Sequence, residues 1–309
     1  MAEPVLIVGS MALDDIETPF GGVRGAVGGA GTYAALAASL LAPVRLTGIV
    51  GEDFPASALA DLASRGIDLG GVEIVPGGRS FRWGGRYHFD MNTRETLYTD
   101  LGVFANFSPE LPLGWADTPF VFLANIQPQL QYHVLSQIRS PRFVMADTMD
   151  LWIESEREAL LDLLRRVDVL LVNDAELRQL SREHNLTVAA ARVLDYGPRY
   201  VVVKKGEYGA ALVWRDGHFA IPALPLPDVV DPTGAGDTFA GGMIGMLAWL
   251  GDTSEAALRQ ALVVGTAAAS LCVQDFGIEA LKKVTVAHLY ERYETLRAMT
   301  TFAPCPLHV

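Results

Sequence analysis

The chain has 309 residues, half of them hydrophobic, and a formal net charge of −12 at pH 7. The acidic balance argues against nucleic acid and against an anionic membrane surface as partners. No apolar run approaches the roughly 18 residues of a membrane-spanning helix. The first residues lack the basic start of a signal peptide, and the two cysteines are far apart. We therefore expect a cytoplasmic, globular protein with a single domain over residues 1–309.

The N-terminal region begins with a short apolar run, Val5 to Val8, which predicts a buried central strand. Asp14 follows beyond the carboxyl end of this strand, where ligands bind in open α/β sheets. A solvated turn is the alternative for this residue. A glycine-dense stretch, residues 21–31, leads into a helix that we expect at residues 32–41, and a strand is expected at 44–50.

The same glycines also match a loose dinucleotide-binding pattern, with Glu52 at a suitable distance for a ribose contact. That pattern must follow directly on a hydrophobic strand. Residues 21–27 do not form one, so the sequence does not favour a dehydrogenase.

A hairpin with one aromatic face is predicted next. Residues 79–90 alternate between aromatic and polar side chains, and residues 96–99 suit a return strand. The aromatic face must lie on the rest of the domain or on a second copy of the chain; an ordinary edge hairpin is the alternative. Arg82 and Arg86 share the polar face, and we expect Arg82 in particular to reach the substrate. A solvated pair beside acidic neighbours is the alternative.

From residue 120, strands and helices alternate, which predicts a parallel sheet covered by helices. Strands are expected at 120–124, 143–146, 169–172, 200–203, 210–214 and 217–221, and helices at 129–138, 154–166, 256–273 and 288–299. Asn125 and Asp147 follow strand ends, where they would face a crevice, and we expect Asn125 to contact the substrate. Lys204 and Lys205 follow another strand and are two of the few cations available to a polyanionic substrate.

Asn173 and Glu176 follow the strand at 169–172, and their spacing is that of a helix capping box. A more specific pattern lies at residues 231–237, a turn of small residues that opens a buried helix. The N–H groups at such a helix start predict an anion site, with phosphate as the usual occupant. Asp237 lies in its wall, either as a helix cap or as a base between a phosphate and a hydroxyl group.

Residues 231–237 resemble the C-terminal signature of the ribokinase-like (PfkB) family of carbohydrate and nucleoside kinases, and the likeness extends from Val5 to Gly277. It implies a three-layer α/β/α fold with a central, mostly parallel sheet. A small β-lid would come from residues 11–27 and 79–106, and residues 300–309 would form a loose tail. The implied activity is ATP-dependent phosphorylation of a hydroxyl group on a small sugar-type substrate. A nucleoside kinase of the same family is the alternative, and a catalytically silent sensor is a third hypothesis.

The resemblance also implies roles for individual residues. Asp237 would be the general base, and the amides of Gly234, Ala235 and Gly236 would form the anion hole. Asp14, Gly28 and Gly29 would contact the substrate, together with Tyr33, which stands where the family signature usually carries Asn and could stack on a base. The nucleotide would lie against Asn173, Glu176, Lys205, Gly206, Gly209 and Gly277. Mg²⁺ would be bound through water by Asn173 and Glu176, and K⁺ by Asp231 and Thr233. The lid would often form a homodimer contact.

Overall fold

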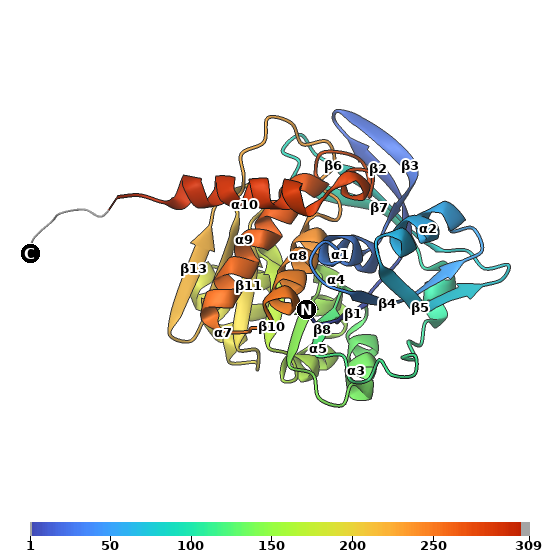
Figure 1. The fold of residues 1–309 in the computed structure, drawn as a ribbon, viewed down its shortest axis with the longest axis horizontal. Coiled ribbons are helices and arrows are strands. Elements are labelled where there is room, and N and C mark those ends of the chain that lie inside the picture. Colours follow the sequence, from blue (N-terminus) through green and yellow to red (C-terminus); the bar gives the residue numbers. More distant parts are fainter. Residues whose placement is uncertain (1, 304–309) are drawn as a thin grey trace, which may run out of the picture.

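The fold is built around a nine-stranded sheet, seen in a computed structural model that describes residues 2–303 (Figure 1). The strand order is β13-β12-β11-β10-β9-β8-β1-β4-β5. The neighbours from β11 to β5 pair in parallel, and β12 and β13 add an antiparallel edge. The strands are β1 (Val5–Val8), β4 (Val44–Gly51), β5 (Ile67–Val75), β8 (Phe120–Leu123), β9 (Phe143–Asp147), β10 (Val169–Asn173), β11 (Tyr200–Lys204), β12 (Ala210–Trp214) and β13 (Gly217–Ile221).

Helices cover both faces of this sheet, because its central strands are apolar on both sides and must be buried twice. One face packs against α1 (Ala30–Ala38), α2 (Ala56–Ser64), α8 (Ala235–Leu250), α9 (Glu255–Cys272) and α10 (Val286–Thr300). The other packs against α3 (Pro128–Gln137), α4 (Asp150–Ser155), α5 (Arg157–Leu164), α6 (Asp174–Ser181) and α7 (Leu186–Leu194). The expected three-layer α/β/α fold with a mostly parallel sheet is confirmed.

A second sheet of four strands lies beside the large one, in the order β3-β2-β6-β7. It consists of β2 (Ala12–Thr18), β3 (Gly21–Gly28), β6 (Phe81–Tyr87) and β7 (Arg94–Asp100). These strands come from the two segments expected to form a lid. We call this element the small sheet.

The register of the small sheet decides which of its side chains share a face. Asp14 of β2 pairs with Trp83 of β6, and Arg86 of β6 pairs with Glu17. Since side chains alternate along a strand, Asp14, Trp83 and Tyr87 lie on one face. Arg82 and Arg86 lie on the other.

Some sequence expectations differ from the structure. The single helix expected at 154–166 is two helices, α4 and α5, because Glu156 has non-helical backbone angles (φ −127°, ψ 33°). The sequence did not predict α2 and β5. Of the tail expected at 300–309, Thr300 ends α10, residues 301–303 have no regular structure, and 304–309 lie outside the described residues. Among residues 2–303, no helix is both long and apolar enough to span a bilayer.

Candidate active site

A cavity of about 820 Å³ lies at the carboxyl ends of the parallel strands. The ends of β9, β10 and β11 form its floor, the start of α8 forms one wall, and the loop between β6 and β7 lies over it. Its lining includes Asn125, Asp147, Asn173, Lys204, Gly236 and Asp237. Residues from opposite halves of the sequence therefore meet in one cavity, as expected for an open α/β sheet.

The turn before α8 is held by Asp231, whose side chain is buried. One of its carboxylate oxygens accepts from the Thr233 N–H at 2.8 Å, and the other accepts from the Gly277 N–H at 3.1 Å. Gly234 adopts φ 75° at the N-cap, a conformation that favours glycine. This turn places the start of α8 at the cavity.

The three predicted anion-hole amides differ in their hydrogen bonds. The N–H of Ala235 donates to the Pro232 carbonyl at 3.2 Å, which closes the turn. Within residues 2–303, the N–H groups of Gly234 and Gly236 have no backbone or side-chain acceptor. These two amides, at the positive end of the helix dipole, are the ones available to an anion.

Asp237 lies in the first turn of α8 and lines the cavity. Burial and the negative charge of Asp147 raise the pKa of Asp237 to about 6, although Lys204 and Arg94 act in the opposite direction. A carboxylate with this pKa is mostly ionised at pH 7 and still basic enough to accept a proton from a hydroxyl group in a transition state.

Lys204 is the cation beside the predicted anion site. Its Nζ lies 2.7 Å from a carboxylate oxygen of Asp147, which is only 3% exposed. A Cβ placed on Gly236 would lie 3.2 Å from the same Nζ, so the ammonium group is next to the start of α8. Lys204 ends β11 and Lys205 follows it, and of the two it is Lys204 whose ammonium group lies beside Gly236.

Asn173 and Glu176 form the capping box of α6. The Asn173 side chain accepts from the Glu176 N–H at 2.7 Å, and Glu176 Oε2 accepts from the Asn173 N–H at 2.7 Å. Burial raises the pKa of Glu176 to about 7, with Lys204 lowering it and Asp147 raising it. Within residues 2–303, no hydrogen bond reaches the second carboxylate oxygen of Glu176, and the residue lines the cavity.

Asp14 is 4% exposed, and its carboxylate lies against Gly28. Burial and the nearby charges of Asp231 and Asp237 hold the pKa of Asp14 well above its usual range. A Cβ on Gly28 would overlap the Asp14 carboxylate, so this glycine leaves room for the acid. Gly29, with φ 94°, packs against the backbone of Ser10 and starts α1. The structure thus brings Asp14, Gly28 and Gly29 together, with Asp14 close enough to Asp237 for their charges to interact, although none of the three lines the cavity.

Tyr33 is 1% exposed, and its ring lies directly against Gly234, where any Cβ would overlap it. One face of the ring is therefore covered by the anion-site turn and is not free to stack on a base. Its buried hydroxyl group has no hydrogen-bond partner among the described residues.

The small sheet presents a different arginine to the cavity from the one the sequence indicated. Arg82 pairs with Asp53 at 3.2 Å on the face opposite to Asp14, so the structure does not bring it to the cavity. Arg94, at the start of β7, lines the cavity instead. Sequence reasoning missed it because residues 92–95 resembled a polar turn.

Asn125 lines the cavity at the end of β8. Its amide donates towards the Met149 sulfur at 3.2 Å and accepts from the Trp152 indole N–H at 3.0 Å. These bonds fix its orientation, because both ends of the amide have a partner.

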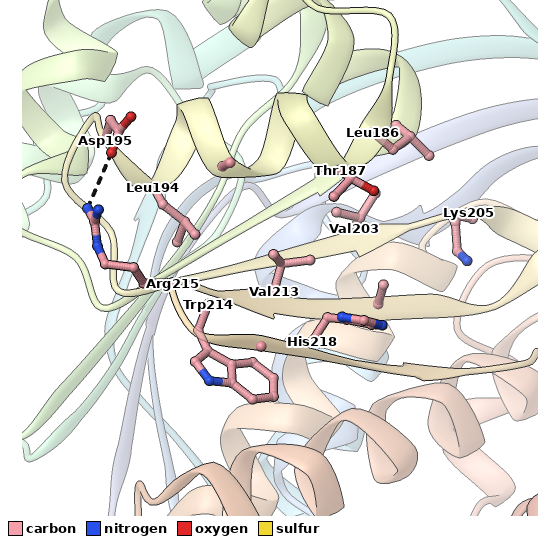
Figure 2. Close-up of a pocket in the computed structure, with 13 residues that line it drawn as sticks. Leu186, Thr187, Leu194, Asp195, Val203, Lys205, Val213, Trp214, Arg215 and His218 are labelled. Atoms are coloured by element: carbon pink, nitrogen blue, oxygen red, sulfur yellow. Dashed lines mark hydrogen bonds and ion pairs between the residues drawn. The ribbon is translucent and has the colours of Figure 1, made fainter.

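Of the remaining predicted nucleotide residues, Lys205 and Gly206 line the cavity, whereas Gly209 and Gly277 are not in its lining. Gly206 and Gly209 begin and end a tight turn, with φ 53° and 89°. Lys205 lies between the cavity and a second hollow of about 570 Å³. Figure 2 shows this hollow between α7 and the β12–β13 hairpin, with the Arg215–Asp195 ion pair at its far end. Gly277 packs against β3 of the small sheet and donates to Asp231.

Comparisons with known proteins agree with this geometry. The family model "pfkB family carbohydrate kinase" matches residues 14–283. A cytidine kinase from Thermococcus kodakarensis is 31% identical over 78% of this chain and 87% of the relative. An ATP-dependent ribose-1-phosphate kinase from Halopiger xanaduensis is 30% identical over 77% of this chain and 78% of the relative. A nucleoside kinase from Burkholderia thailandensis, solved with inosine, superposes with a TM-score of 0.76 at 22% identity, covering 95% of this chain and 99% of that one.

The family model spans most of the sequence, including both ends of the cavity. The structural neighbour has the same fold over almost its whole length. The protein is therefore a sugar or nucleoside kinase with the ribokinase fold, and the chain belongs to the PfkB family of carbohydrate kinases.

Proposed function

We propose that the protein transfers the terminal phosphoryl group of ATP to a hydroxyl group of a small sugar-type substrate. The observation that carries this proposal is the convergence of three groups on one cavity: the Asp237 carboxylate, the free N–H groups at the start of α8, and the Lys204 ammonium. A base, an anion site and a cation in one place are the parts that phosphoryl transfer needs.

In the proposed reaction, the substrate hydroxyl oxygen forms a bond to the terminal phosphorus, and the bond from that phosphorus to the oxygen bridging to ADP breaks. Asp237 takes the hydroxyl proton. The N–H groups of Gly234 and Gly236 and the Lys204 ammonium stabilise the negative charge on the transferring group. Asp147 keeps Lys204 in place through their 2.7 Å ion pair.

The residues near Glu176 fit Mg²⁺ bound through water. Glu176 uses one carboxylate oxygen in the capping box and has the other available towards the cavity. No group of three or more His, Cys, Asp or Glu side chains suited to direct metal binding occurs in the part of the chain that the structure describes. When bound with the nucleotide, Mg²⁺ would neutralise phosphate charge. Asn173 and Glu176 would orient its water ligands.

Asp231 and the Thr233 carbonyl remain our proposal for one side of a K⁺ site. Both oxygens of Asp231 already accept backbone hydrogen bonds, from Thr233 and Gly277. A carboxylate oxygen can accept a further contact, so a cation beside the turn would add to these bonds.

The acceptor would lie between Asp14 and Asp237, under the small sheet, which acts as the lid. Asp14 is the polar group that faces Asp237 from β2. A nucleoside acceptor is the second candidate, favoured by the names of the relatives, which act on cytidine or bind inosine. A ribose unit is common to cytidine, inosine and ribose-1-phosphate, so ribosyl compounds are the first acceptors to test. The intact Asp237 argues against a silent sensor.

The test is a coupled assay of ADP formation by the purified protein with Mg²⁺ and ATP, over pentoses, hexoses, sugar acids, sugar phosphates and nucleosides. We expect ADP formation well above the acceptor-free rate with at least one compound. An acceptor-independent rate across the whole panel would contradict the proposal.

A further inference from the structure

The hollow of about 570 Å³ between α7 and the β12–β13 hairpin has no role in the proposed phosphoryl transfer (Figure 2). Its floor is one face of the large sheet. Val203 pairs with Ala211, and Val213 pairs with His218, so the pleat places these four side chains on the same side of the sheet. Leu212 points to the other side and is buried in the layer that contains α9. The hollow therefore has a flat and largely apolar floor.

α7 forms the wall of the hollow with the apolar side chains of Leu186, Ala191 and Leu194. One end is closed by an ion pair, in which the Arg215 guanidinium lies 3.2 Å from a carboxylate oxygen of Asp195 (Figure 2). Because these two charges balance each other, this end offers no net charge to a ligand.

The end of the hollow opposite to this ion pair carries Thr187, Lys205 and His218 (Figure 2). Lys205 lines both the hollow and the proposed ATP cavity. Within residues 2–303, no ion pair and no side-chain hydrogen bond reaches its ammonium group, whereas the Lys204 ammonium is paired with Asp147. An unpaired cation at the edge of an apolar floor suits a ligand that carries an acidic group on an apolar body.

We propose that this hollow is a second ligand site, which binds a small organic anion with a flat apolar body and thereby weakens the binding of ATP. The acidic group of the ligand lies at the Lys205 ammonium. The Thr187 hydroxyl and the His218 imidazole are further hydrogen-bond donors at the same end. The apolar body lies on the floor of the hollow and against α7, where it is removed from water.

Lys205 connects the second site to the proposed ATP cavity. Its backbone N–H donates to the Gly209 carbonyl at 2.8 Å, which fixes it in the turn that starts at Gly206 beside the cavity. A ligand anion at the ammonium group offsets a positive charge near the nucleotide phosphates and adds a negative one. By linkage, the nucleotide weakens the binding of the ligand by the same factor. Only this coupling rests on the proposed kinase function.

The first test uses a fluorescent aromatic anion, anilinonaphthalene sulfonate, and the uncharged phenylnaphthylamine, which has the same rings without the sulfonate. Both dyes are titrated into wild type, Ala191→Trp and Lys205→Met. Ala191 is exposed on α7, so a tryptophan there occupies the hollow and displaces no core residue. Ala60→Trp is the matched control, since Ala60 is an exposed alanine of α2, outside the lining of the hollow.

We expect wild type to bind the sulfonate dye at one saturable site, and Ala60→Trp to bind it equally well. Ala191→Trp and Lys205→Met should each reduce its affinity by about tenfold or more, the effect of a lost contact to a charged group. Lys205→Met should leave the affinity of the uncharged dye unchanged. Absence of saturable binding to wild type overturns the proposal, and so does an unchanged affinity of the sulfonate dye in an Ala191→Trp variant with a native circular dichroism spectrum.

The second test measures the coupling by titrating the sulfonate dye at increasing concentrations of ADP with Mg²⁺, which requires neither turnover nor a known acceptor. Because the two ligands occupy separate sites, the apparent Kd of the dye should rise and then level off at about fivefold or more. A rise without limit would assign the hollow to the nucleotide itself, and an unchanged Kd would exclude the coupling; either result overturns the proposal. A wild type without kinase activity contradicts the proposed function alone, because the dye titrations still decide whether the hollow binds an anion.

Discussion

The Asp237→Asn variant distinguishes two roles of Asp237, a general base and a helix cap. The two roles predict opposite changes in stability. Burial raises the pKa of Asp237 from 3.8 to about 6. Since this pKa is raised in the folded state, the ionised carboxylate destabilises the fold above pH 6, by up to about 3 kcal/mol at 1.36 kcal/mol per tenfold change in proton affinity. A neutral amide removes this cost. It also loses a favourable interaction with the helix dipole of about 0.3–1 kcal/mol.

We therefore expect Asp237→Asn to be more stable than wild type by about 2 kcal/mol at pH 7–8, in line with a strained functional site. The gain should shrink as the pH falls from 6 to 4, where the wild-type carboxyl group becomes protonated in both states. Urea unfolding of both proteins at several pH values measures this difference in the free energy of unfolding. A variant that is less stable at pH 8 would show that Asp237 acts as a cap.

The same variant should lose activity. Loss of a general base costs about 10²–10⁴ in rate, and we expect the loss in kcat, with little change in ATP affinity. The wild-type kcat/KM should fall with decreasing pH below about 6, the pKa of Asp237, whereas the residual rate of Asp237→Asn should lack this dependence. Near-normal turnover by Asp237→Asn would refute the assignment of the base.

Three further predictions concern the surrounding groups. Gly236→Val should obstruct the proposed anion site and displace Lys204, whose Nζ lies 3.2 Å from the position of a Cβ. Loss of one hydrogen-bond donor from an oxyanion site costs about 2.7–4 kcal/mol in transition-state binding. A folded variant with normal kcat would exclude the anion hole. Lys204→Met should lower kcat and weaken ATP binding, whereas Lys205→Met should change neither by more than a few fold. Steady-state kinetics measure both effects, and equal effects of the two variants would contradict the assignment of Lys204. Phe20 and Phe89 are two exposed rings of the small sheet region, with ring centroids 6.1 Å apart. If the lid forms a homodimer contact, the double variant Phe20→Asp, Phe89→Asp should sediment as a monomer. A wild type that already sediments as a monomer would show that there is no such dimer.

The sequence predicts the large sheet well, because its strands are short apolar runs bounded by turn residues. The strands at Val5–Val8, Ala210–Trp214 and Gly217–Ile221 have the expected bounds. The turn before α8 was also predictable, since glycines before a helix with no charged residue after Asp237 leave few alternatives. In contrast, the break between α4 and α5 lies in a charged amphipathic stretch whose periodicity continues through it.

The hairpin of β6 and β7 in the small sheet was predictable, but its orientation was not. Alternation gives two faces and does not say which one meets the cavity. The pairing of Asp14 with Trp83 determines this, and places Arg82 outside and Arg94 inside. Likewise, Lys204 and Lys205 are equivalent in sequence, and only the buried partner Asp147 distinguishes them.

The most direct test of the central claim is to follow the terminal phosphate of ATP itself. Wild type and Asp237→Asn are incubated with Mg²⁺, terminally labelled ATP and the best acceptor, and the products are separated and identified by mass spectrometry. We predict that wild type moves the label onto a hydroxyl group of the acceptor, one phosphoryl group per ADP, and that Asp237→Asn is slower by about 10²-fold or more. Label found only in inorganic phosphate, or equal transfer by both proteins, would contradict the account.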